Sequence, residues 1–200
     1  LQGFIGWYMV SSGLVDRVDV SHFRLAVHLV LAFIILSLIL WNYLNYQEIK
    51  LSNKKINKFL PFLFVVFLFI QITVGAFVSG MDAGKIYNSW PLMGSNFFPD
   101  DSMITNLFHL SALSEPSLVQ FIHRNFAYLI LLIYLYMFFT VYKNKHSNYF
   151  KILSIVGLFL FLQILLGILT LLSGAKIFIS SLHQISSIFL ISSSIYFLNI

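Results

Sequence analysis

Long apolar runs divide this 200-residue sequence into segments that are each long enough to cross a lipid bilayer. A spanning helix needs about 20 apolar residues, because it rises about 1.5 Å per residue through a hydrocarbon layer of about 30 Å. The runs that meet this requirement are Phe23–Leu44, Phe59–Gly80, Leu118–Tyr142, Phe150–Leu172 and Ile177–Leu198. The pattern therefore predicts five membrane-spanning helices.

Two further segments complete the predicted layout. Leu1–Leu14 is apolar from its first residue and resembles the end of a sixth span. Because the chain begins with Leu1 instead of Met, we expect a partial sequence with further helices upstream. The connection Met81–Ser117 is long and polar enough to hold short interfacial helices, but no separate soluble domain is expected there.

Composition supports the membrane assignment. The chain is 59% hydrophobic and 10% charged, whereas soluble domains carry about 25% charged residues. So few charges cannot coat a water-exposed surface. The predicted fold class is an all-α membrane protein, a transmembrane helix bundle.

The chain has a net charge of +5, and many of its basic residues lie in the connections between the spans. Basic residues gather in two connections separated by two spans, which places them on one side of the membrane: Lys50, Lys54, Lys55 and Lys58, then Lys143, Lys145 and Lys151. Cytoplasmic loops carry such an excess, so the charge indicates topology and not nucleic-acid binding. The short loops favour a bacterial inner membrane, with the mitochondrial inner membrane as the alternative. The chain has no cysteine, which excludes disulfides and thiolate ligands within it.

A short motif occurs three times. Gln2-x3-Gly6, Gln71-x3-Gly75 and Gln163-x3-Gly167 each precede a helix with a histidine near its start. Small residues allow close helix packing in lipid, and a glutamine inside a span needs a hydrogen-bond partner, so packing is the first interpretation. The repeat also predicts helix pairs, two of which make a four-helix bundle. We expect residues 1–58 to be the C-terminal part of one such bundle and 59–200 a complete, homologous second one.

The three histidines that follow the motif are His28, His123 and His183. Each lies five to seven residues into a helix that enters from the same side, about 8 Å below the rim. Ionisable residues inside spans are rare and usually functional. Two imidazoles from facing helices can ligate haem iron, so all three are candidate metal ligands. His123 and His183 form a complete pair, and a partner for His28 is expected upstream of Leu1. Two alternatives remain, hydrogen-bonded packing and zinc, which needs three or four ligands.

Arginines accompany two of these histidines. Arg24 lies one helical turn outward of His28, and Arg124 directly follows His123. Arginine pairs with carboxylates in a bidentate manner, so both are candidate ligands of haem propionates. The alternative is ordinary snorkelling to the interface. His22, His109 and His146 are expected at the surface.

Several stretches resemble the heme A synthase family in the family's own order. They are Gly6–Val10 with Ser12-Gly13-Leu14, Arg24-Leu25-Ala26-x-His28-Leu29, Gly80–Asn88 with Pro91-Leu92-Met93, Val119-Gln120-Phe121-x-His123-Arg124, and Leu166–Thr170 with Leu182-His183-Gln184. The resemblance implies an eight-helix protein of two similar four-helix bundles. It also implies an oxidoreductase that converts the methyl group of haem O to the formyl group of haem A.

By that resemblance, His123 and His183 match the ligands of a haem b, and His28 matches the first bundle, where substrate haem O binds. The family's first bundle carries a Glu-x-x-His-Arg motif proposed to be catalytic, and the second bundle here has Gln120 in place of the acid. The catalytic residues are therefore expected upstream of Leu1. Asp82 and Lys85 either brace the porphyrin edge or cap a helix, and capping is favoured.

The rival hypothesis is a non-enzymatic bis-histidine cytochrome b that only transfers electrons. It shares the bundle, the histidine pair and the arginines near the rim. A transporter is disfavoured, because the predicted spans hold no acidic residue for coupling. The expected partners are the lipid bilayer, haem O and haem A, and an electron donor that the sequence does not identify. A homo-oligomer is compatible with either hypothesis.

Overall fold

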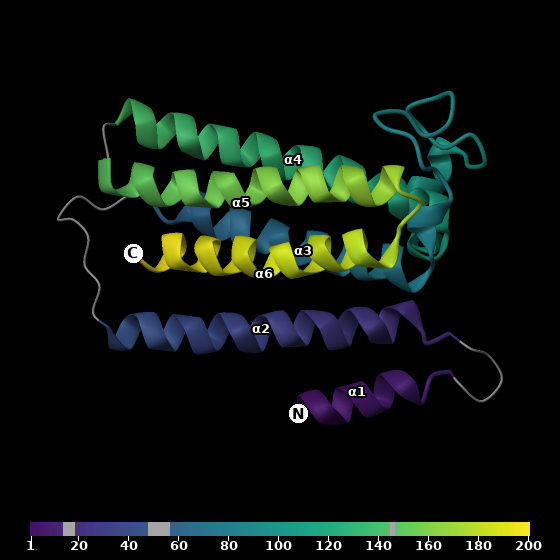
Figure 1. Cartoon of the computed structure of the whole chain (residues 1–200), viewed down its shortest axis with the longest axis horizontal. Coiled ribbons are helices and arrows are strands. Elements are labelled where there is room, and N and C mark those ends of the chain that lie inside the picture. Colours follow the sequence, from purple (N-terminus) through teal and green to yellow (C-terminus); the bar gives the residue numbers. More distant parts are fainter. Residues whose placement is uncertain (14–18, 48–56, 145–146) are drawn as a thin grey trace.

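A computed structural model of the chain describes residues 1–13, 19–47, 57–144 and 147–200. These residues form helices and no strand. The long helices are α1 (Gln2–Val10), α2 (His22–Tyr46), α3 (Phe59–Gly80), α4 (Pro116–Lys143), α5 (Ser147–Leu172) and α6 (Ile177–Asn199), and they run side by side in Figure 1. Three short 3-10 helices, η1 (Ala83–Lys85), η2 (Ile104–Phe108) and η3 (Leu110–Ser114), lie in the connection between α3 and α4.

Helices α3 to α6 pack as a ring of four. α3 contacts α4 and α6, and α5 contacts the same two helices, so α4 and α6 face each other across the diagonal. The interior is filled by large apolar side chains that are almost fully buried, including Phe64, Ile130, Leu153 and Ile191. Burial of such side chains against one another fixes the helices in this order.

The two N-terminal helices lie outside this ring. α2 packs against α3 and α6, and α1 packs against α2. In Figure 1 the chain starts at the outer edge, with α1 below α2 and α2 below the four-helix ring. The division at residue 58 into parts of two bundles stays a prediction.

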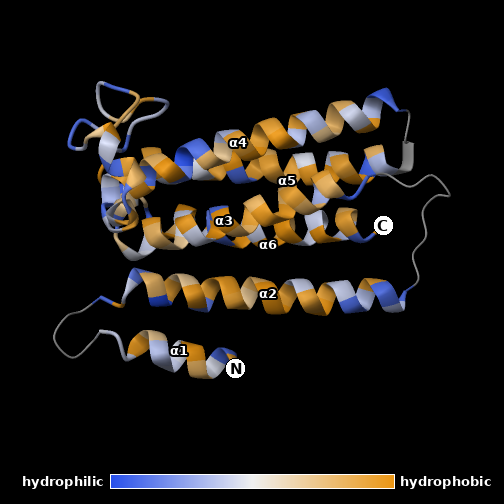
Figure 2. Ribbon diagram, turned by 180° about the vertical axis from the view of Figure 1, so that it is seen from behind, coloured by the Kyte–Doolittle hydropathy of each residue, from blue (hydrophilic) through white to orange (hydrophobic). Residues whose placement is uncertain are grey.

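Five of these helices, α2 to α6, are long and apolar enough to cross a membrane. Large apolar side chains cover their outward faces, among them Ile39, Leu132, Leu158 and Phe161, each more than 60% exposed. Figure 2 shows apolar residues along most of each long helix, with a few polar bands inside α3 and α4. Such a surface is stable in lipid and not in water. The chain is a multi-pass membrane protein, and the predicted fold class is confirmed.

The ends of α2 to α6 lie within three residues of the predicted ones, and α1 ends at Val10, four residues before the predicted Leu14. α4 starts at Pro116, two residues earlier than predicted, because proline lacks an N–H and is well suited to the first turn of a helix. Residues 11–13 and 19–21, and the connections 81–115 and 173–176, lie at one end of the structure, which is called the outer end. Lys50, Lys54, Lys55, Lys145 and His146, used in the topology prediction or assigned to the surface, are outside the described residues.

Candidate functional site

Each Gln-x3-Gly segment lies directly against the histidine of the next helix. A Cβ atom placed on Gly6 would be 3.1 Å from Cε1 of His28, one on Gly75 would be 3.1 Å from Cε1 of His123, and one on Gly167 would be 3.0 Å from Cε1 of His183. The edge of each imidazole therefore rests on the bare backbone of the partner helix. The repeat in the sequence is a repeat of this contact, formed by α1 with α2, α3 with α4, and α5 with α6.

The glutamines of the first two segments hold the same histidines from a second direction. Nε2 of Gln2 donates to the backbone carbonyl oxygen of His28 at 3.0 Å, and Nε2 of Gln71 donates to that of His123 at 3.0 Å. The amide nitrogen of Gln71 lies 3.4 Å from Nε2 of the His123 imidazole, and that of Gln2 lies 3.3 Å from Nδ1 and 3.4 Å from Nε2 of the His28 imidazole. The predicted partner of the intramembrane glutamine is therefore the histidine itself.

The third segment differs from the other two because a serine of α6, Ser186, also contacts its glutamine. Nε2 of Gln163 lies 3.4 Å from Nε2 of His183, and the hydroxyl of Ser186 donates to Oε1 of Gln163. Ser186 also lies 2.9 Å from the carbonyl oxygen of His183 and is 5% exposed. Ser186 was not among the predicted site residues. The available signal was its position three residues after the histidine, which puts both on one helix face.

His123 and His183 belong to the two helices that face each other across the ring. Both side chains are partly buried. Nδ1 of each ring is buried and has no hydrogen-bond partner among the described residues. Buried polar atoms are normally paired, so these orphaned nitrogens mark rings whose hydrogen bonding is incomplete. The pair has the residue types and the diagonal placement that a bis-histidine haem site needs.

His28 has the same local contacts but a more open setting. It lies between α1 and α2, outside the ring, and no second histidine faces it from the described helices. The zinc alternative has no support in this part of the chain, because no group of three or more His, Cys, Asp or Glu side chains among the described residues could hold a metal ion.

Arg124 holds the loop that follows η1. Its Nη2 donates to the carbonyl oxygen of Tyr87 at 2.9 Å, and its Nη1 donates to those of Ser89 at 3.0 Å and Leu92 at 3.2 Å. Gln120, one turn earlier on α4, donates to the same Tyr87 oxygen at 3.0 Å. The guanidinium therefore has backbone carbonyl partners within the protein, and these were not predicted from the sequence. Its role toward a propionate stays a prediction.

Arg24 binds the C-terminal end of α1. Its guanidinium donates to the carbonyl oxygen of Tyr8 at 2.9 Å and lies 4.0 Å from the centre of the Tyr8 ring. Asp82 and Lys85 form an ion pair of 2.9 Å at η1, with both side chains more than half exposed. Asp82 is the N-cap residue of η1 and its side chain makes no capping hydrogen bond.

The other histidines are placed as follows. His109 is exposed, as predicted. His22 is not a free surface residue: it is partly buried, and its ring packs against Phe23 and, edge-on, against Phe77 of α3. The prediction was wrong because Gly80 leaves room for His22 between the two helices, where a Cβ on Gly80 would be 2.8 Å from the His22 Cβ.

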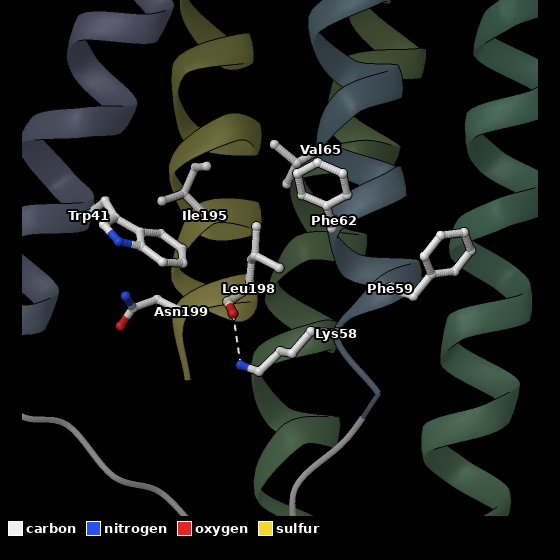
Figure 3. Close-up of a pocket in the computed structure, with 8 residues that line it drawn as sticks. All are labelled: Trp41, Lys58, Phe59, Phe62, Val65, Ile195, Leu198 and Asn199. Carbon is white, nitrogen blue, oxygen red and sulfur yellow. Dashed lines mark hydrogen bonds between the residues drawn. The ribbon is translucent and has the colours of Figure 1, made fainter.

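A groove of about 750 Å³ lies at the opposite end of the structure from the histidines, between α2, α3 and α6. Figure 3 shows its mostly apolar lining, including Trp41, Phe62 and Ile195. Lys58 donates from Nζ to the carbonyl oxygen of Leu198 at 2.7 Å, and burial lowers the pKa of its ammonium group. Among the described lining residues, the Lys58 ammonium and the Asn199 amide already have partners within the protein, and no histidine or carboxylate is present.

Comparison with known proteins places these features in a family. The sequence model of the COX15-CtaA family, cytochrome oxidase assembly proteins, matches residues 1–195. A protein named heme A synthase from Pelagibacter ubique is 48% identical over 199 residues, covering 99% of this chain and 58% of that protein. Heme A synthases from Rickettsia felis and Rickettsia prowazekii are 41% and 39% identical, covering 98% of this chain and 59% of each relative. The chain thus spans just under three fifths of the length of these relatives, and it belongs to the COX15-CtaA family of cytochrome oxidase assembly proteins.

Proposed function

We propose that this chain is the haem-ligating part of a heme A synthase, an oxidoreductase that converts the methyl group of haem O to the formyl group of haem A. The family and the name of its relatives support the reaction class. Because the chain spans 58% of the first relative, the activity is proposed for the protein of which this chain forms a part. The bacterial relatives also favour a bacterial inner membrane.

The observation that carries the proposal is the pair His123 and His183 on diagonally opposed helices. Their Nδ1 atoms are buried without partners, and each ring is fixed by a glycine and a glutamine of the neighbouring helix. A neutral imidazole offers one lone pair to a metal, and these two rings would be the axial ligands of a haem b. Such a haem supplies one-electron transfer.

The remaining candidate residues take subordinate roles in the proposal. His28, outside the ring, would contact substrate haem O. Arg124 would reach a propionate only by releasing some of the loop carbonyls that it holds now. No described residue of the chain is proposed as the catalytic acid or base, and the electron donor is not assigned.

The experiment compares His123→Ala and His183→Ala with His109→Ala in the protein purified from membranes. His109 is exposed in the outer connection and serves as the matched control. Each of the first two variants should lose the six-coordinate low-spin haem spectrum, while the control should retain it. A six-coordinate spectrum unchanged in both ligand variants would refute the assignment.

A second measurement separates the enzyme from the rival electron-transfer cytochrome. Cells that make haem O but no haem A are given the protein, and their haems are extracted and separated. Conversion of haem O to haem A supports the synthase. A protein that binds haem b with both histidines but leaves haem O unchanged is a cytochrome b of the electron-transfer class.

A further inference from the structure

The contact shared by the three histidines goes beyond helix packing. We propose that the glutamine and the glycine of each Gln-x3-Gly segment are positioning residues for the paired histidine, and that Ser186 makes His183 the most firmly oriented of the three. This inference rests on the proposed function, in which His123 and His183 are axial ligands. It adds the residues that set the direction of their lone pairs.

The glycine determines where the ring lies. At Gly75 and Gly167 a side chain would begin 3.1 Å and 3.0 Å from Cε1 of the imidazole. This is closer than ordinary van der Waals contact, so even an alanine at either position would require the ring to shift by a few tenths of an ångström. Bare backbone on one side and the histidine's own helix on the other leave the ring little freedom to rotate.

The glutamine determines which nitrogen can accept. A carbonyl oxygen only accepts hydrogen bonds, so the bond from Gln71 to the His123 carbonyl requires the amide nitrogen to face α4. The second N–H of that nitrogen is then directed at the imidazole, 3.4 Å from Nε2. An N–H favours an unprotonated nitrogen opposite it. Gln71 therefore stabilises the neutral ring with its lone pair on Nε2 and its proton on Nδ1. Iron would bind this lone pair in place of the amide N–H, while the bond from Gln71 to the His123 carbonyl keeps the two helices in register.

Ser186 replaces the glutamine–carbonyl bond in the third pair. Its hydroxyl lies within hydrogen-bond distance of Oε1 of Gln163 and of the carbonyl oxygen of His183, and its single proton serves one of these two acceptors at a time. In the other two pairs the position three residues after the histidine is Leu31 or Phe126, and the amide oxygens of Gln2 and Gln71 are buried without a partner. Only the third amide has both ends held, so the orientation of His183 is the best defined.

The test uses two substitutions with matched controls. Ser186→Ala removes the hydroxyl, and Ser194→Ala removes another buried α6 hydroxyl, which bonds only Leu190 of its own helix. Gly167→Ala places a methyl group against His183, and Gly84→Ala places one where the nearest side-chain atom is 3.4 Å away. Haem b is titrated into each purified variant, and its affinity and low-spin electron paramagnetic resonance spectrum are recorded, because that spectrum responds to rotation of the axial imidazole planes.

We expect Gly167→Ala to lower the affinity for haem b about 10- to 100-fold, because a shifted axial ligand should weaken metal binding about as much as the loss of a residue that orients one. Ser186→Ala should shift or broaden the low-spin signal, and both controls should match the unsubstituted protein. If Gly167→Ala yields no folded protein, the comparison of Ser186→Ala with Ser194→Ala tests the positioning role by itself.

The outcomes also separate this inference from the proposed function. If Ser186→Ala matches Ser194→Ala in both affinity and spectrum while His183→Ala still loses the haem, the positioning role is wrong and the ligand assignment stands. If the unsubstituted protein binds no haem b, the ligand assignment fails, and the positioning role fails with it.

Discussion

Replacement of Arg124 by methionine tests whether this arginine holds a loop or a propionate. Methionine keeps much of the apolar stem and removes the hydrogen bonds to the carbonyls of Tyr87, Ser89 and Leu92. A hydrogen bond to a charged group contributes about 1.5–3 kcal/mol. Three such bonds are not additive, and water can reach carbonyls near the rim. We therefore expect the opening of this loop to become easier by roughly 2–4 kcal/mol, or about 30- to 900-fold.

The assay is hydrogen–deuterium exchange of the haem-free protein at Met93 and Gly94. These amides are protected by the carbonyl of Asn96 at 2.7 Å and the hydroxyl of Ser89 at 3.0 Å, so they report on the closed loop. Arg24→Met, which removes an arginine at the end of α1, should leave their exchange unchanged. Unchanged exchange in Arg124→Met would refute the loop role and leave the propionate as its main partner.

Three further outcomes follow from single contacts. Gly157→Ala should destabilise the protein, because the new methyl group would collide with the Tyr134 hydroxyl, and thermal unfolding in detergent measures the loss. Asp82→Gly should be neutral or stabilising in the same assay, since Asp82 has a φ of 53° that favours glycine. Burial and the Asp101 carboxylate raise the pKa of Tyr87, so Asp101→Asn should lower this pKa. The measurement is an ultraviolet titration of tyrosine ionisation, with Tyr87→Phe as the control that identifies the Tyr87 signal. The neutral phenol stabilises the fold below pH ~10, and this contribution is lost as the pH rises through the raised pKa.

The spans could be predicted from the sequence because their length and apolarity are imposed by the bilayer and not by partners. α3 and α6 begin at the predicted residues, Phe59 and Ile177. The rotation of each helix could not be predicted in the same way. A soluble helix shows its buried face by an apolar stripe, but here the faces toward lipid and toward the core are both apolar. Only the sparse polar residues show which face turns inward, and the Gln-x3-Gly segments are the clearest of these.

Hydrogen bonds from side chains to backbone carbonyls could not be predicted from the sequence, for a different reason. Every residue carries a carbonyl oxygen, so nothing in the side chains around Tyr87 and Ser89 marks them as partners of Arg124. The propionate prediction considered only side-chain and cofactor charges, and it therefore missed acceptors that the protein itself supplies. The position of His22 was likewise not marked in the sequence, because its neighbours on α3 are the apolar ring of Phe77 and the bare backbone of Gly80.

Gln120 connects this loop to the difference between the two bundles that the family resemblance implies. The resemblance places a glutamate three residues before the first histidine of the other bundle, whereas Gln120 here donates to the carbonyl of Tyr87. An ionised carboxylate has no proton to donate and would repel that oxygen. A glutamate at position 120 would therefore open the loop that Arg124 and Gln120 close together. In the proposed function, the neutral amide would suit a bundle that holds its histidines still, and an acid would suit one that admits and processes a substrate.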